Sequence, residues 1–228
     1  MIIYSLNLLG VETMANIKQS LIKAIETAKN ESKKRSFTQS IELIVALRDI
    51  DMKKPENRIN EKITLPNAIN KPFKICVFGD GDFALKAKEA GADTVIGRDQ
   101  LEILGSNKKS AKKIVKEHDI FLARADFMPL VGRYLGSVLG PRGKMPDPVP
   151  PSGDVKTAIE RAKSTLRIRS RTQPLIQCAI GTEDMPSDKI AENGEAVITA
   201  LERKLKSLHN IQAIYVKATM GKPIKVES

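Results

Sequence analysis

The sequence predicts two domains of mixed α/β and α+β class: a discontinuous α+β domain built from both ends of the chain, and an α/β domain inserted into it. A length of 228 residues suits two domains of ordinary size. Apolar strand-like runs alternate with helical stretches in the middle of the chain, which is typical of a parallel sheet covered on both faces. The two ends instead share a pattern that favours an antiparallel sheet with helices on one face.

The N-terminal part predicts one helix and one strand. Apolar residues recur at helical spacing from Asn16 to about Lys33, with lysine and glutamate between them, so we expect an amphipathic helix. SIELIVAL, which begins at Ser40, has the period-two alternation of a half-buried strand, and KKPENRI breaks it. Residues 1–13 precede Met14, a more natural start, and are interpreted as an extension.

The inserted domain is expected over residues 71–149. FKICVF predicts a strand, DFALKAKEAG a helix and DTVI a strand. The lysine-rich run from Lys108 to Lys116 then predicts a helix with a solvated face, and IFLARA another strand. The proline-rich MPDPVPPSG that follows predicts a stiff linker back to the first domain.

The C-terminal part, residues 150–228, is expected to complete the domain begun by residues 1–70. DVKTAIERAKS and PSDKIAENGEAVITALERKLKSL predict helices, and LRIRSR, LIQCAI and IQAIYVKATM predict strands. Cys76 and Cys178 lie in apolar runs, so both are expected to be buried free thiols in a reducing compartment. Neither histidine has a metal ligand at suitable spacing, so no metal site is expected.

Charge indicates the class of partner. With 38 Lys+Arg against 27 Asp+Glu, the net charge of +11 points to a polyanion. A membrane is disfavoured because no apolar run approaches the roughly 20 residues needed to span a bilayer. Arg167, Arg169 and Arg171 alternate along a predicted strand, so their guanidinium groups would share one face and repel unless an anion neutralises them. Aromatic content of 4% supplies little base stacking, so a folded RNA recognised by shape and backbone fits best.

The segment GDGDFA, Gly79–Ala84, supports a competing hypothesis. It matches the dinucleotide pattern G-x-G-x-x-A after a strand and before a helix, so the alternative function is a nucleotide-dependent enzyme. Asp80 and Asp82 would oppose a pyrophosphate there, and Asp82 is expected to cap the next helix instead. Because no catalytic pair or triad stands in a convincing context, a protein without enzymatic activity is preferred.

A second glycine-rich stretch runs from Gly132 to Gly143. Gly132, Gly136 and Gly140 recur every fourth residue, which places them on one helix face and allows a neighbouring backbone to approach closely. The P-loop pattern is not met, since Met145 stands where a hydroxyl belongs. Two interpretations stay open: a tightly packed helix, or an exposed basic turn at GPRGK that contacts phosphate.

Four segments resemble the ribosomal protein L1 family, the stalk protein of the large ribosomal subunit, and its archaeal branch in particular. They are RSFTQSIE at 35–42, DIDMKKPENRI at 49–59, GRYLGSVLGPRGKMPDPVP at 132–150 and TMGKPIKV at 219–226. The similarity covers most of residues 15–226. It implies an inserted Rossmann-like, three-layer domain without a nucleotide cofactor, a tightly packed helix and turn over Gly132–Gly143, and a stiff linker after them.

The resemblance also implies a function. A family member would be a cytoplasmic, ribosome-associated protein that binds the stalk region of the large-subunit rRNA, aids release of exit-site tRNA and represses translation by binding its own mRNA. By position, the family's RNA contacts correspond here to Phe37, Ser40, Glu42, Thr219, Met220 and Gly221. Hydroxyls and backbone amides can reach ribose and phosphate, the large apolar side chains can pack on sugar or base, and Glu42 can accept from a 2′-OH. The alternative for Glu42 is an exposed strand carboxylate without a ligand.

Overall fold

The computed structural model describes residues 3–54, 57–151, 153–170, 173–205 and 210–227, with side chains from Asn16 onward. Two compact units make up the chain: Met1–Lys71 with Ser164–Ser228, and Pro72–Lys163. Each unit has its own apolar core. None of the described helices combines the length and apolarity needed to cross a membrane.

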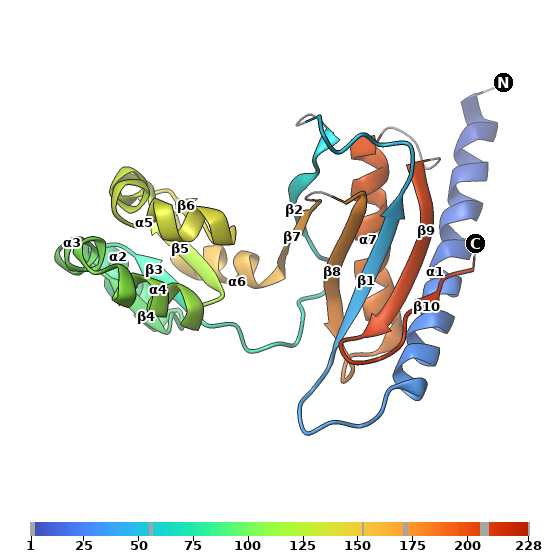
Figure 1. Cartoon of the computed structure of the whole chain (residues 1–228), viewed down its shortest axis with the longest axis horizontal. Coiled ribbons are helices and arrows are strands. Elements are labelled where there is room, and N and C mark those ends of the chain that lie inside the picture. The colour runs from blue at the N-terminus through green and yellow to red at the C-terminus, as the bar shows by residue number, and fades with distance from the viewer. Residues whose placement is uncertain (1–2, 55–56, 152, 171–172, 206–209, 228) are drawn as a thin grey trace. The chain divides into compact units, whose positions relative to one another are not determined.

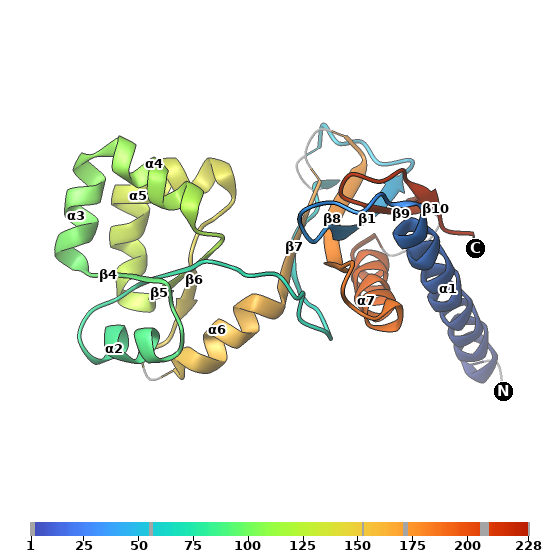
Figure 2. The ribbon, with the colours of Figure 1, turned by 90° about the horizontal axis from the view of Figure 1, so that it is seen from below.

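The first unit is an antiparallel sheet with helices on one face (Figures 1 and 2). Its strands are β1 (Ser40–Leu47), β8 (Leu175–Thr182), β9 (Ile211–Ala218) and β10 (Ile224–Lys225), in the order β10-β9-β1-β8. Helices α1 (Ile3–Glu31) and α7 (Ser187–Leu205) bury residues such as Leu21 and Val197 against this sheet. Alternate residues of β1 are buried, as the period-two pattern predicted, and the other face of the sheet is open.

A two-stranded ribbon lies beside β8 in the same unit. Strands β2 (Asn60–Thr64) and β7 (Thr165–Arg169) pair antiparallel, with Asn60 opposite Arg169 and Lys62 opposite Arg167. The sequence pattern predicted β7 and did not predict β2, because NEKIT carries a single large apolar residue and gives no clear alternation.

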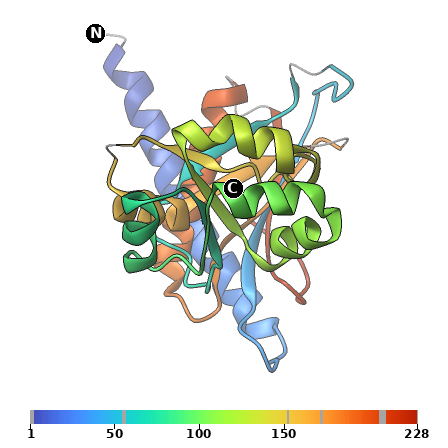
Figure 3. The same ribbon diagram turned by 90° about the vertical axis from the view of Figure 1, so that its left-hand side faces the viewer.

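The second unit is a parallel sheet covered on both faces, which confirms the predicted fold class (Figures 1 and 3). The strands are β3 (Ile75–Phe78), β4 (Thr94–Ile96), β5 (Ile120–Arg124) and β6 (Asp147–Val149), in the order β4-β3-β5-β6. Helices α3 (Arg98–Ser106), α4 (Lys108–Glu117) and α5 (Met128–Arg142), with the short 3-10 turn Ala125–Phe127, pack on one face. Helices α2 (Asp82–Glu89) and α6 (Val155–Ser164) pack on the other.

The proline-rich segment after α5 is a strand and not the expected linker. Residues Asp147–Val149 form β6, which pairs parallel with β5, and Val149 is buried. Proline is tolerated there because β6 is an edge strand, where a missing N–H breaks no ladder on the outer side. Helix α6 then packs Val155 and Ile159 into the second unit, so the chain returns to the first unit at 163–164 rather than at 149–150.

The glycine stripe of α5 does not pack closely against a neighbour. A Cβ added at Gly132, Gly136 or Gly140 would meet nothing within 4 Å among the described residues. The helix itself is confirmed, but its buried side is the one that carries Val131 and Leu135. The expected tight contact is therefore wrong at these glycines, since they lie on the open side of the helix.

Candidate nucleic-acid interface

The start of β1 and the end of β9 are joined by a dense set of hydrogen bonds at one end of the open sheet. The backbone N–H of Thr219 donates to the carbonyl of Ser40 at 3.0 Å. The Thr219 hydroxyl donates to the same carbonyl at 3.1 Å and accepts from the Ser40 N–H at 3.2 Å. Gly221 donates its N–H to Ala218 at 2.8 Å and closes the turn that follows β9. We call residues 37–42 together with 219–221 the junction.

Gln39 organises the junction from inside and was missed by sequence reasoning. This side chain is 1% exposed. Its amide nitrogen donates to Ser32 Oγ at 2.7 Å and to the Lys33 carbonyl at 3.2 Å, while its amide oxygen accepts the N–H of Met220 at 3.2 Å. Its backbone N–H donates to the Glu183 carboxylate at 3.0 Å, and its carbonyl accepts from the Glu183 N–H at 2.9 Å. The available signal was its position, because Gln39 continues the buried phase of the β1 alternation.

Two large apolar side chains project from this frame. Phe37 is 51% exposed and Met220 is 62% exposed, although the Met220 backbone N–H is held by the buried Gln39 side chain. A Cβ on Gly221 would lie 3.2 Å from the Cβ of Ala218, so the turn beside Met220 favours glycine. The junction therefore presents apolar surface on a fixed backbone, which is suited to packing on a sugar or an unstacked base.

Glu42 is the last residue of the first junction segment and lies on the open face of the sheet, between side chains from the two neighbouring strands. Gln177 on β8 donates to Glu42 Oε2 at 2.6 Å, and the ammonium of Lys217 on β9 lies 4.0 Å from the same oxygen. The Glu42 side chain is 19% exposed, so the alternative of an exposed strand carboxylate does not describe it, since it is largely covered. Its other oxygen takes part in neither contact and can accept from a ligand hydroxyl.

The loop between β8 and α7 is tied to the last turn of α1. Lys29 donates a hydrogen bond from its ammonium to the carbonyl of Met185. Burial lowers the pKa of Lys29, and the nearby carboxylates of Asp184, Glu26 and Glu183 partly offset that shift. Glu183, which holds Gln39, lies in the same loop as Met185. Helix α1 therefore helps to fix the position of the junction through this loop.

The predicted arginines lie on the ribbon and not at the junction. Arg167 and Arg169 are exposed on either side of the buried Ile168, which confirms their alternation. Arg167 donates from Nε to Asn60 Oδ1 at 2.9 Å and stands opposite Lys62. Arg171 lies outside the described residues. The structure thus divides the predicted site residues into two groups, the junction and a basic ribbon face.

The Gly79–Ala84 loop of the second unit uses its polar groups internally. Both oxygens of Asp80 accept from the N–H of Arg98, at 3.2 and 3.3 Å, at the start of α3. Asp82 does not cap α2 as expected. It occupies the first turn and pairs with Lys86 at 2.8 Å. A Cβ on Gly79 would lie 2.5 Å from the Phe83 ring, so this ring fills the space beside the loop. The carboxylate of Asp80 therefore bonds to the start of α3, and the negative charges of Asp80 and Asp82 beside the loop would oppose a phosphate.

Comparisons with known proteins show to which proteins the sequence is similar. Residues 25–222 match the model of the ribosomal protein L1p/L10e family. The chain is 52% identical to the large ribosomal subunit protein uL1 of Thermofilum pendens over 209 residues, which cover 91% of this chain and 92% of that protein. It is 47% identical to the uL1 protein of Methanothermococcus thermolithotrophicus and 46% identical to that of Methanothermobacter thermautotrophicus. Each of these two matches spans 211 residues, or 92% of this chain. The first covers 99% of its relative, and the second covers 100%.

Proposed function

The chain belongs to the ribosomal protein L1p/L10e family, and from this premise we propose that its junction binds the stalk region of the large-subunit rRNA. Membership makes the chain a structural, non-enzymatic constituent of the large ribosomal subunit that binds rRNA and is located with the ribosome in the cytoplasm. The proposal adds which part of the RNA is bound, and by which residues.

The exposure of Phe37 and of Met220, at the two chain segments that Gln39 and Thr219 join, is the observation that carries the proposal. A domain gains nothing in stability by exposing large apolar side chains, whereas a binding surface uses them. Gln39 follows Phe37 by two residues, and its buried side chain accepts the N–H of Met220. Preorganisation of this kind lowers the entropy lost on binding.

The remaining predicted residues have distinct roles in the proposed complex. Ser40 and Thr219 hold the two strands together, because the threonine hydroxyl already donates to and accepts from the Ser40 backbone. Glu42 accepts from a ribose 2′-OH. Arg167 and Arg169 contact phosphates from the ribbon, where both side chains are exposed on the same side of β7. The unit formed by both chain ends is therefore the proposed RNA-binding domain.

Binding of the full chain to a stalk rRNA fragment tests this proposal. Met220→Ala and Phe37→Ala should each weaken binding by about tenfold, on the order of 1–2 kcal/mol for a lost stacking contact, with an unchanged melting temperature. Leu175→Ala is the matched control, since Leu175 is also an exposed apolar residue of the first unit but lies at the far end of β8. Equal affinity for an unrelated duplex of the same length, or unaltered binding by both variants, would contradict the proposal.

Salt dependence separates the junction from the ribbon. Arg169→Ala should reduce the slope of log K against log salt by about one, since each phosphate contact releases about one counterion. Met220→Ala should leave that slope unchanged. If both variants altered the slope alike, the two groups would not have the different roles assigned to them.

We further propose that the same surface represses translation by binding a similar structure in the protein's own mRNA, and that the protein aids release of exit-site tRNA. The family resemblance supports both roles. A fragment of the mRNA should compete with the stalk rRNA for one site, and Met220→Ala should weaken both to the same extent. Simultaneous binding of both fragments would contradict the shared site. Ribosomes reconstituted without the protein should release exit-site tRNA more slowly.

The competing enzymatic hypothesis is overturned by the family assignment. The charge of the Gly79–Ala84 loop gives a physical reason, because the carboxylates of Asp80 and Asp82 would repel a pyrophosphate. Adding NAD or ATP should therefore leave the melting temperature unchanged.

A further inference from the structure

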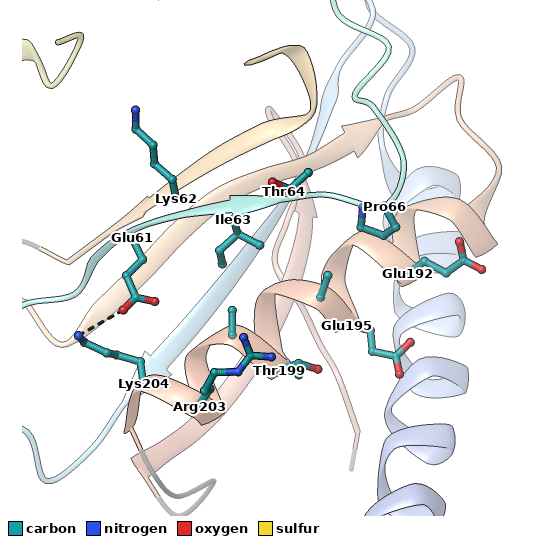
Figure 4. Close-up of a pocket in the computed structure, with 12 residues that line it drawn as sticks. Glu61, Lys62, Ile63, Thr64, Pro66, Glu192, Glu195, Thr199, Arg203 and Lys204 are labelled. Carbon is teal, nitrogen blue, oxygen red and sulfur yellow. Dashed lines mark ion pairs between the residues drawn. The ribbon is translucent and has the colours of Figure 1, made fainter. Parts of the chain in front are cut away.

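A groove of about 720 Å³ runs between β2 and α7 in the first unit, away from the junction (Figure 4). Its floor is small and apolar, with Ala196 and Ala200 from α7 and Ile63 from β2. Charged residues lie along its length: Glu195 lies near the middle of α7, and Arg203 lies toward the end of that helix. The groove therefore has the polarity of a site for a segment with a charge at each end.

Strand β2 is the outer edge of the strand layer that α7 supports. Among the described strands it pairs only with β7. The N–H of Leu65 donates to Ser164 and that of Ser170 donates to Ile59, at 2.8 and 2.9 Å, so odd-numbered residues of β2 bond inward. In an antiparallel pair the alternate residues then direct their backbone groups outward, which applies to Asn60 and Thr64. The residues of α7 that line the groove lie beside this edge, where a further strand paired with β2 would cover them.

The charges in the groove are only partly neutralised by the protein. Glu61 pairs with Lys204 at 3.2 Å, and Glu192 pairs with Lys18 at 3.1 Å. Glu195 and Arg203 make no hydrogen bond or ion pair with any residue that the structure describes, although both line the groove. Eight residues of helix separate them, or about 12 Å at 1.5 Å per residue. An extended chain covers that distance in about four residues.

We propose that this groove binds an extended polypeptide segment as an added strand on the edge of β2. The segment runs antiparallel to β2 and carries a basic residue, a small apolar residue and an acidic residue at positions i, i+2 and i+4. These three side chains face α7, where they meet Glu195, the alanine floor and Arg203 in turn. The intervening residues exchange backbone hydrogen bonds with β2.

The direction of the segment follows from the placement of β2. Glu61, near the start of β2, pairs with Lys204 near the end of α7, whereas Asn67, just beyond β2, bonds to Glu192 near the start of α7. Strand and helix therefore run in opposite directions. Antiparallel pairing is the more stable mode, so the added segment runs parallel to α7 and its basic end lies at Glu195.

Two other occupants fit the groove less well. RNA is disfavoured because the lining holds three acidic and three basic side chains: Glu61, Glu192, Glu195, Lys62, Arg203 and Lys204. The groove is thus neutral on a chain whose net charge is +11. A second copy of the chain is disfavoured because antiparallel pairing of two β2 strands about their centre would place Lys62 against itself.

The test uses the full chain and the labelled, capped peptide Thr-Lys-Val-Ala-Val-Glu-Thr, with Thr-Glu-Val-Ala-Val-Lys-Thr as its charge-swapped counterpart. The first peptide should bind more tightly, and its binding should shift the backbone amide resonances of Asn60 and Thr64. Replacing both valines by proline should abolish binding, because this removes the N–H groups that would donate to β2.

Charge reversal in the protein makes the test specific. Glu195→Lys or Arg203→Glu should each weaken binding of the first peptide by about two- to fivefold, as expected for a partly exposed ion pair. The double variant should instead prefer the charge-swapped peptide. Lys23→Glu is the matched control for Arg203→Glu, since it makes the same change in net charge on the exposed side of α1 and should alter neither affinity.

Several results would overturn the inference. Absence of binding at millimolar peptide concentration is one, and equal affinity for the two peptides in both wild type and double variant is another. Resonance shifts confined to the open face of the sheet would place the peptide elsewhere. Displacement of the peptide by an unrelated RNA duplex would assign the groove to nucleic acid, and dimerisation that the peptide abolishes would assign it to a second copy.

Discussion

Two loops that follow strand ends, residues 219–221 after β9 and residues 79–84 after β3, both have sequences that suggest a binding site, yet they are built in opposite ways. In the first, buried polar groups hold the backbone so that Met220 projects outward. In the second, the polar groups of Asp80 bond to the next helix and Phe83 turns inward, where it is 6% exposed.

The difference lies in which groups the fold leaves for a ligand. The junction holds its strand ends together internally and presents apolar side chains, while the Gly79–Ala84 loop bonds the Asp80 carboxylate to the next helix and presents no exposed aromatic ring. A motif is thus a binding site only if tertiary contacts leave its reactive groups unsatisfied.

The largest effect is expected at the centre of the junction. Gln39→Leu leaves the Met220 N–H and the groups at Ser32 and Lys33 without their buried partner, at about 1–3 kcal/mol for each group that cannot reach water. The free energy of unfolding should fall by about 3 kcal/mol, and the affinity for stalk rRNA should fall with it. Chemical denaturation and RNA titration measure both. Gln212→Leu, at an exposed position of β9, should change neither.

A smaller loss of stability is expected at Gly97, the residue before α3 that faces Asp80 of the Gly79–Ala84 loop. A Cβ on Gly97 would lie 2.4 Å from Asp80 Oδ1, so Gly97→Ala should expel that carboxylate from the start of α3. The loss of such a cap costs about 1–2 kcal/mol. Affinity for the stalk rRNA should stay the same, because the proposed site lies in the other unit. A loss of affinity equal to that of Met220→Ala would remove the distinction between the two loops.

Thr219→Val sharpens the comparison within the junction itself. The variant keeps the side-chain shape but removes the hydroxyl that bonds to both backbone groups of Ser40, so stability should fall by about 1 kcal/mol. Met220→Ala should leave stability unchanged, because that side chain is exposed. Thermal unfolding of the two variants distinguishes a residue that holds the frame from one that is presented by it.

Gly136→Ala should stabilise the second unit by about 0.5–1 kcal/mol, because alanine lowers the conformational entropy of the unfolded chain. The added methyl group would meet nothing within 4 Å in the folded helix. The originally expected tight helix contact predicts the opposite sign. Differential scanning calorimetry of this variant therefore tests whether the side of α5 that carries the glycines is open. A lowered melting temperature would instead support a tight helix contact at Gly136.

The smallest effect concerns the two buried thiols, one in each unit. Burial raises the pKa of Cys76 and of Cys178 to about 12, compared with a usual value of 9.0. The folded thiols therefore stay protonated while those of the unfolded chain ionise, so stability should decrease as the pH rises above about 9. At pH 8 a thiol-reactive dye should label each only through opening of its own unit. Gln39→Leu should accelerate labelling of Cys178 alone, and Gly97→Ala that of Cys76 alone.

The sequence by itself determined the fold class, the type of most elements and the class of partner. Alternation along β1 and β7, the apolar runs that contain both cysteines, and the charge of +11 are local or summed properties that can be read without coordinates. The family resemblance added the positions of the junction residues. Burial has a fixed period in a strand and a helix, so periodicity alone records which side faces the core.

Only the tertiary structure decided how the polar groups of the two loops are satisfied. Gln39 bonds to Glu183 and Met220, which lie 144 and 181 residues away in the chain, and no local pattern encodes such a pairing. The same holds for the pairing of β6 with β5, for the β2 edge above α7, and for the open side of the glycine stripe. A hydrogen bond depends on where the fold brings its partner, and that position is a property of the packed chain as a whole.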